Sequence, residues 1–250
     1  MSMAIEVENL TVRYEKIVNR PTTLKELAVR MVKRKVASQD VIALSDVSFS
    51  IEHGEVYGII GRNGAGKSTL LKVLSRIIPP SSGRVITRGR ITPLLGVGAG
   101  FHQELSGREN LFLYSALLGR TRNETKNLFD QIVEFSDLQK YIDSPIRIYS
   151  TGMVARLGFS VAMATQPDIL LVDEVLSVGD EEFKNKCRSR FAEFRKKGAT
   201  ILFVSHSLPT IQELCTKATW IHEGRVNKTG KTDEVISAYK DLIRGGKKAK

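Results

Sequence analysis

One short segment constrains the fold of this chain more than any other. Residues 56–60 (VYGII) form a brief apolar run, and residues 61–69 (GRNGAGKST) follow it directly. Helical periodicity then continues to Leu74, and the prolines at positions 79 and 80 end it. A strand, a glycine-rich loop and a helix in this order are the context in which a GxxxxGKST sequence binds phosphate. The segment therefore predicts an α/β fold with a nucleotide site at the end of a strand.

The residue types in the loop suit phosphate chemistry. A glycine backbone approaches phosphate oxygens closely because no Cβ intervenes, and the N–H groups at a helix N-terminus favour negative charge. We expect Lys67 to reach the β- and γ-phosphates and Ser68 to offer its hydroxyl to Mg²⁺. The predicted nucleotide-binding residues of the loop are Gly61, Arg62, Asn63, Gly64, Ala65, Gly66, Lys67, Ser68 and Thr69.

Two further apolar runs end in polar residues that suit the same chemistry. Asp173 and Glu174 follow the run 169–172, and His206 lies just after the run 200–204. We expect Asp173 to bind Mg²⁺, Glu174 to polarise the attacking water and His206 to contact the γ-phosphate. The alternatives are two acids at the protein surface and a histidine with a structural role. The predicted catalytic residues are Lys67, Glu174 and His206, and the predicted metal ligands are Ser68 and Asp173.

Strands and helices alternate along most of the chain, which predicts a mainly parallel sheet with right-handed crossovers. Helical periodicity dominates between residues 107 and 166, where Thr121–Glu124 resembles a capping box. We therefore expect one α/β domain of the P-loop NTPase type over residues 1–250, with an antiparallel β edge. Its core lobe comprises residues 1–106 and 167–250, and an all-helical lobe of residues 107–166 is inserted into it.

The formal net charge of +11 is the one unusual bulk property. Such a charge suits nucleic acid, an anionic membrane face or a phosphorylated substrate. No apolar window is long enough to span a bilayer, and the N-terminus lacks the pattern of an export signal. Cys187 and Cys215 have neither metal-ligand nor disulfide-framework spacing, which fits a reducing cytosol. The composition therefore favours a cytosolic protein with an anionic partner.

A second motif narrows the class of nucleotide-binding protein. Tyr149–Met153 (YSTGM) precedes Asp173 by about twenty residues and resembles the signature sequence of ATP-binding-cassette (ABC) proteins. Together with the phosphate loop, it makes the chain resemble the nucleotide-binding subunit of an ABC transporter from Tyr14 to about His206. This resemblance implies an ATPase in which two copies of the chain enclose two ATP molecules.

The resemblance also implies roles for residues outside the phosphate loop. Ser150 and Gly152 match the serine and the central glycine that one subunit presents to the γ-phosphate held by the other. Ser177–Asp180 matches the D-loop that crosses the dimer interface, which assigns Asp180 to that interface. Tyr14 falls where the family stacks an aromatic residue on adenine, and a plain strand aromatic is the alternative.

One departure from the family pattern concerns the loop that enters the helical lobe. Members of the family normally carry a glutamine at the end of the preceding strand, where it contacts Mg²⁺ and senses the γ-phosphate. That position falls near residues 95–97 (LGV) in this chain, and Gln103 comes too late in the loop. We therefore expect no metal-sensing role for Gln103.

Three features resemble one branch of the family, the ATPases that export bacterial cell-surface polysaccharides and teichoic acids. They are the YSTGM signature, residues 98–110 (GAGFHQELSGREN) and an extra segment over 16–40, where that branch has a gate helix. Apolar and basic residues at helical spacing over 24–35 predict an amphipathic helix that suits an anionic leaflet or a diphosphate-linked lipid. The alternative is a surface helix packed on its own domain.

The resemblance further implies partners and a place in the cell. We expect a homodimer, bound to integral membrane permease subunits and peripheral to the cytoplasmic face of the bacterial inner membrane. Such a translocase would move a lipid-linked polysaccharide of the O-antigen or lipopolysaccharide type, and no nucleic acid is expected. The alternatives are an ABC ATPase for another transported cargo and an ABC ATPase associated with nucleic acid.

Overall fold

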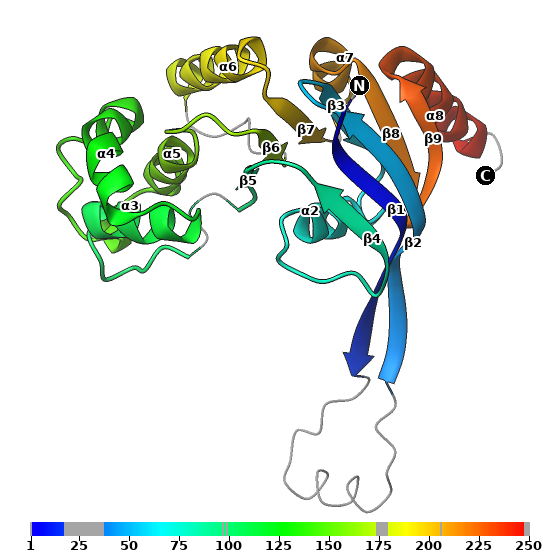
Figure 1. Ribbon diagram of the computed structural model, residues 1–250, viewed down its shortest axis with the longest axis horizontal. Coiled ribbons are helices and arrows are strands. Elements are labelled where there is room, and N and C mark those ends of the chain that lie inside the picture. Colours follow the sequence, from blue (N-terminus) through cyan, green and yellow to red (C-terminus); the bar gives the residue numbers. More distant parts are fainter. Residues whose placement is uncertain are drawn as a thin grey trace, which may run out of the picture.

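The central sheet of the computed structural model joins six strands in the order β5-β6-β7-β3-β8-β9 (Figure 1). The first five in this order run parallel, and β9 pairs antiparallel with β8. The strands are β3 (Val56–Ile60), β5 (Ile91–Leu94), β6 (Ile169–Val172), β7 (Thr200–Val204), β8 (Lys217–His222) and β9 (Arg225–Lys231). Strands β3, β6 and β7 are buried along their whole length, and apart from Thr200 at the start of β7 their sequences lack the polar alternation of a half-exposed strand.

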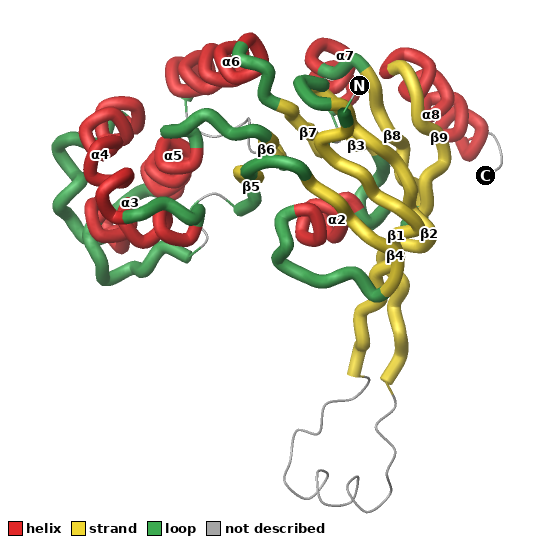
Figure 2. Tube along the Cα trace, viewed as in Figure 1, coloured by secondary structure: helices red, strands yellow, loops and turns green. Residues whose placement is uncertain are grey.

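A second, antiparallel sheet joins β1 (Met3–Ile17), β2 (Ser38–Glu52) and β4 (Ser82–Thr87) in the order β2-β1-β4. The far ends of β1 and β2 project from the rest of the molecule as a two-stranded hairpin (Figure 2). The predicted mainly parallel core with an antiparallel edge is thus confirmed.

The structure describes residues 2–17, 38–96, 98, 100–173, 180–205 and 207–247. Both ends of the extra segment expected over 16–40 belong to strands. Residues 16–17 are the end of β1, and residues 38–40 are the start of β2. The basic helix predicted over 24–35 lies outside the described residues. Within the described part of the chain, no helix is both long and apolar enough to cross a membrane.

Helices cover both faces of the central sheet. Helix α2 (Lys67–Leu74) lies between the two sheets and shares a hydrophobic core with both. Helices α6 (Glu181–Lys196), α7 (Leu208–Leu214) and α8 (Thr232–Lys247) pack on the opposite face (Figure 1). Alternate residues of the buried strands contribute to the two cores, so the sheet is held from both sides.

The helical lobe contains α3 (Gly107–Leu117), α4 (Arg122–Ser136), the 3₁₀ turn η1 (Ile146–Ile148) and α5 (Thr151–Ala162). The predicted capping box at the start of α4 is confirmed, since the Thr121 N–H donates to the Glu124 carboxylate at 2.7 Å and the Thr121 hydroxyl accepts from the Glu124 N–H. Ser106 and Glu109 form a second capping box, which starts α3 and which the sequence analysis did not predict.

An aromatic cluster joins the helical lobe to the core lobe. The ring of Phe159 in α5 lies 5.7 Å from that of Phe183 and 6.0 Å from that of Phe191, both in α6. Phe135 of α4 packs against Phe159 and Phe183, at 6.3 and 5.7 Å between ring centroids. These side chains belong to one hydrophobic core that continues to the central sheet. The orientation of α5 is therefore coupled to α6.

Candidate nucleotide-binding site

The phosphate loop lies at the carboxyl edge of the central sheet, where it connects β3 to α2. Gly66 is the N-cap residue of α2 and has a φ of 104°, a conformation that favours glycine. The order β6-β7-β3 and the parallel register bring the ends of these three strands to the same edge. Asp173, which follows β6, therefore lies at the edge that carries the loop. This is the expected arrangement for a carboxylate that shares Mg²⁺ with a bound nucleotide.

Close packing beneath the loop explains two of its glycines. A Cβ on Gly66 would lie 2.6 Å from the carbonyl oxygen of Ala43 in β2, and one on Gly61 would lie 2.3 Å from the carbonyl oxygen of Ile221 in β8. Backbone atoms cannot move away as a flexible side chain can. The loop is therefore pressed against both sheets, which fixes the direction in which α2 begins.

Lys67 is folded back over the loop. Its ammonium group donates to the carbonyl of Gly61 at 2.8 Å and to that of Arg62 at 3.1 Å, and the side chain is buried. The outer side of the loop is accessible, because Arg62, Asn63, Gly64 and Ser68 are exposed, whereas Ala65 is buried. The positive charge therefore stands beside accessible N–H groups at the start of a helix, a combination suited to a polyphosphate.

Tyr14 lies next to the end of the phosphate loop. Its hydroxyl is 3.4 Å from that of Thr69, although 55 residues separate the two in the chain. Tyr14 is 38% exposed. The antiparallel sheet thus brings the predicted adenine-stacking residue to the phosphate loop, and its stacking role remains a prediction.

Ser150 and Gly152 lie in the other lobe, at the start of α5 (Figure 1). Ser150 is the N-cap residue, and its hydroxyl accepts a hydrogen bond from the Met153 N–H at 3.2 Å. An open hollow of about 460 Å³ adjoins this end of the helix. The N–H groups of the first turn of α5 therefore lie at the surface of the helical lobe, in the orientation that attracts an anion. One chain thus does not bring the two predicted halves of the site together.

Asp180 has two partners within its own chain. It is the N-cap residue of α6, accepting from the Phe183 N–H at 3.0 Å, and it forms an ion pair with Arg156 of α5. These contacts lower the pKa of Asp180, with the Phe183 N–H as the largest cause. Asp180 was predicted from the sequence to lie at a dimer interface, whereas its partner Arg156, six residues after Ser150 in α5, was not predicted.

The loop that enters the helical lobe is organised by Asn110, which is fully buried. Its side-chain oxygen accepts from the His102 N–H at 2.6 Å, and its amide group donates to the carbonyls of His102, Leu105 and Ser106 at 2.9–3.0 Å. Gln103 follows His102 in this pinned segment and is exposed. Strand β5 ends at Leu94 and no glutamine follows it directly, which fits the expected departure from the family pattern.

Several predicted site residues lie outside the described part of the chain. They are Glu174, His206 and residues 177–179 of the D-loop match. The described part holds one group formed by the phosphate loop, Asp173 and Tyr14, and a second formed by Ser150, Gly152 and Asp180. The roles of all these residues in catalysis and binding remain predictions.

This combination of a parallel α/β core, a phosphate loop and an inserted helical lobe defines an ATPase cassette. A family model described as ABC transporter matches residues 44–177. The O-antigen export system ATP-binding protein RfbB of Klebsiella pneumoniae is 42% identical over 245 residues, 97% of this chain and 100% of that protein. The teichoic acids export ATP-binding protein TagH of Bacillus cereus is 39% identical over 245 residues, 98% of this chain and 44% of that protein.

Solved structures share the fold. A dimeric bacterial ABC transporter cassette superposes with a TM-score of 0.69 at 20% identity, covering 91% of this chain and 98% of that one. This shared fold agrees with the family match and with the two relatives. The protein belongs to the ABC transporter family, as an ATP-binding, ATP-hydrolysing subunit.

The packing of Gly66 predicts a specific loss of function. Gly66→Ala should displace the loop, because the new Cβ meets the Ala43 carbonyl oxygen, and should weaken ATP binding by at least about tenfold. The control is Gly119→Ala, at a glycine with a φ of 78° and open space around its Cβ position. It should cost about 1 kcal/mol of stability and leave ATP binding unchanged. Titration with a fluorescent ATP analogue measures both affinities. Equal affinities for the two variants would contradict the account of the loop.

Proposed function

We propose that this chain is the ATP-hydrolysing subunit of an ABC exporter that moves a lipid-linked cell-surface polysaccharide of the O-antigen type. The main support for the proposal is that the predicted ATP-binding residues are divided between the two lobes of the chain. The phosphate loop lies in the core lobe and the capped start of α5 lies in the helical lobe, so a second copy is needed to complete each site. The named relatives, which act in O-antigen and teichoic acid export, support the cargo.

The proposed chemistry is mainly positioning and charge stabilisation. Lys67 and the N–H groups of the loop hold the phosphates of ATP, and Tyr14 stacks on adenine. Ser68 and Asp173 offer the oxygen ligands that Mg²⁺ prefers, and the bound ion would neutralise charge on the phosphates. Ser68 is exposed and Asp173 follows strand β6 at the same sheet edge, so both oxygen groups fit this use.

In this proposal Glu174 polarises the attacking water, and His206 contacts the γ-phosphate. Ser150 and Gly152 of a second copy approach the γ-phosphate from the opposite side, with the positive end of α5 directed at it. Asp180 lies at the interface between the two copies. Two chains that close on ATP would pull their helical lobes together, and hydrolysis would release them.

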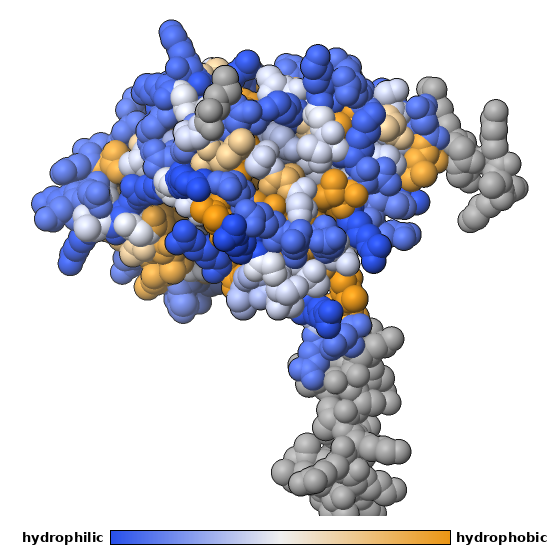
Figure 3. Space-filling view, turned by 45° about the vertical axis from the view of Figure 1, so that its right-hand side comes forward, coloured by the Kyte–Doolittle hydropathy of each residue, from blue (hydrophilic) through white to orange (hydrophobic). Residues whose placement is uncertain are grey.

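The hairpin supports a place at the membrane. It projects from the molecule and carries the exposed apolar residues Val41 and Ile42, which follow the basic segment 24–35 in the sequence. Figure 3 shows a mainly hydrophilic face with apolar residues in small separate patches. We propose that the protein binds integral membrane permease subunits at the cytoplasmic face of the inner membrane, with the segment 24–35 near anionic lipid or substrate headgroups. Another transported cargo is the alternative, and a nucleic-acid partner finds no support in the named relatives.

The assignment of Glu174 predicts a trapped dimer. Glu174→Gln should lower ATP turnover by about 100-fold or more, because the water is no longer polarised, and should accumulate an ATP-bound dimer. Light scattering after size-exclusion chromatography measures the dimer. The control is Glu182→Gln, the same chemical change on the exposed face of α6, which should turn over ATP at the unmodified rate. Turnover at that rate by Glu174→Gln would remove Glu174 from the mechanism.

The export function is tested through the basic segment. Replacing Lys33, Arg34 and Lys35 by glutamine should reduce polysaccharide export by about tenfold or more, since each charge contributes about 1 kcal/mol near an anionic surface. ATP turnover by the isolated chain should be unchanged. Export is measured as surface glycan in cells that depend on this chain. The control replaces Lys247, Lys248 and Lys250 by glutamine. It makes the same change in net charge and should leave export unchanged. Undiminished export by the first variant would leave the segment without a role in transport.

A further inference from the structure

Four consecutive backbone carbonyls at the end of α5, those of Val161–Ala164, accept hydrogen bonds from two arginines. Arg120 donates to the first two, at 2.6 and 3.2 Å. Arg190 donates to the last two, at 3.1 and 3.4 Å. The final carbonyls of a helix lack partners within the helix, so these donors satisfy groups that burial would otherwise leave unpaired. The end of α5, here called the signature helix because it begins at the signature residues Ser150 and Gly152, is thus fixed from two sides.

Arg120 reaches α5 from the turn between α3 and α4. Its side chain is buried, and its hydrogen-bond partners among the described residues are uncharged, the third being the Thr165 hydroxyl at 3.0 Å. Burial, followed by repulsion from Arg90, lowers the pKa of Arg120 to about 10, so the guanidinium stays charged at neutral pH. The negative end of the α5 dipole offsets this charge. Arg120 therefore holds α5 within the helical lobe.

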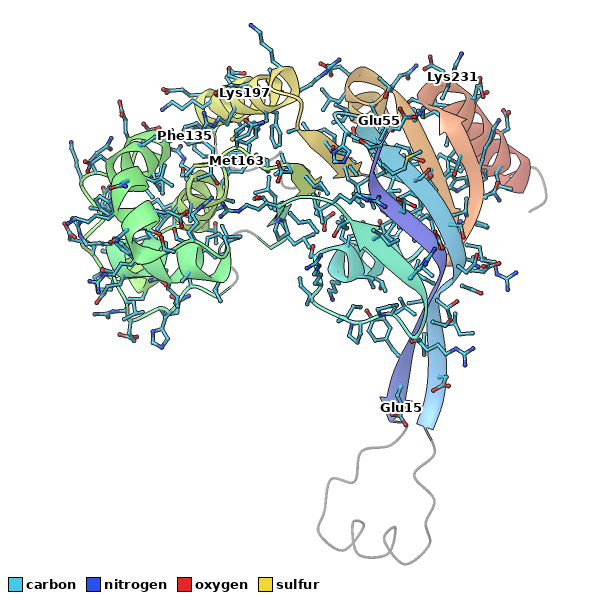
Figure 4. The ribbon with its side chains drawn as sticks, in the orientation of Figure 1. Glu15, Glu55, Phe135, Met163, Lys197 and Lys231 are labelled. Carbon is cyan, nitrogen blue, oxygen red and sulfur yellow. The ribbon has the colours of Figure 1, made fainter. Side chains whose placement is uncertain are left out.

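Arg190 reaches the same end of α5 from the core lobe, because it lies on α6. Figure 4 labels Met163, at the end of α5 and close to α6. The Arg190 guanidinium is 4.9 Å from the ring centroid of Phe194 and donates to the Glu193 carboxylate at 2.7 Å. Both contacts come from α6 itself, so the guanidinium is oriented on its own helix and its remaining donors face α5. Arg190 therefore connects the two lobes.

The other ends of α5 and α6 are also joined. Arg156, in the second turn of α5, pairs with Asp180 at the start of α6 and lies 5.4 Å from the ring centroid of Phe183. Between the two ends, Phe159 packs against Phe183 and Phe191. The signature helix is therefore fastened to α6 at both ends and along its middle.

We propose that Arg190 is a positioning residue for the signature helix. The inference rests on the proposed function, in which Ser150 at the start of α5 meets ATP bound to a second copy. A helix of 12 residues is about 18 Å long, so a tilt of about 10° at one end moves the other by about 3 Å. By holding the end of α5 against α6, Arg190 fixes that tilt relative to the core lobe. It thereby fixes the place of Ser150 when two copies close.

The test separates nucleotide binding within one chain from closure between two chains. In the Glu174→Gln background, Arg190→Ala should weaken ATP-dependent dimerisation by about tenfold, equivalent to the loss of one or two hydrogen bonds from a charged donor. Binding of a fluorescent ADP analogue to the monomer should stay within about twofold, because the phosphate loop is untouched. Analytical ultracentrifugation with ATP measures the dimerisation constant.

Two further variants sharpen the test. Arg195→Ala removes an exposed arginine from the same helix and should leave dimerisation unchanged. Arg190→Lys keeps the charge but not the planar fork, so it should restore dimerisation only in part. Unchanged dimerisation of Arg190→Ala, or an equal loss of ADP binding, would overturn the positioning role. A Glu174→Gln parent that fails to dimerise with ATP would instead contradict the proposed function.

Discussion

The start of α2 is the point on which the rest of this structure depends. A helix N-terminus carries unpaired N–H groups and a partial positive charge, and here both stand at the carboxyl edge of a parallel sheet. Gly61 and Gly66 allow the loop to press against the backbone of both sheets, and two hydrophobic cores hold the sheet from either side. The predicted anion site is therefore built from closely packed backbone, with Lys67 folded over it.

The helical lobe has a different relation to the nucleotide. Its helix N-terminus, capped by Ser150, lies at the surface of the lobe and away from the phosphate loop of the same chain. Arg156 near the start of α5 pairs with Asp180 of α6, and Arg190 of α6 donates to carbonyls at the far end of α5, so α5 is attached to the core lobe. A movement of the core lobe would therefore move α5 with it. In the proposed dimer, this connection would let the half-sites of the two copies act together.

The predictable features were those with a local physical cause. Apolar runs buried on both faces identified β3, β6 and β7, and residue spacing identified the phosphate loop and the Thr121 capping box. Features that depend on tertiary contact were missed. In the sequence, nothing distinguishes Asn110 from other polar helix residues, although its side chain makes four hydrogen bonds that order the loop. Likewise, nothing distinguishes Arg120 and Arg190 from arginines at the surface. Only the folded chain brings Arg120 and Arg190 to carbonyls far away in sequence.

The most direct test of the account is a cross-link between the two half-sites. Asn63→Cys and Thr151→Cys place thiols at exposed positions beside the phosphate loop and the signature serine. The native Cys187 and Cys215 do not interfere, because burial raises the pKa of both thiols to about 12. Mild oxidation should join two copies of this double variant through residues 63 and 151 when ATP is bound, and only weakly with ADP. A cross-link that is absent with ATP, or independent of nucleotide, would contradict the claim that a second copy completes the site.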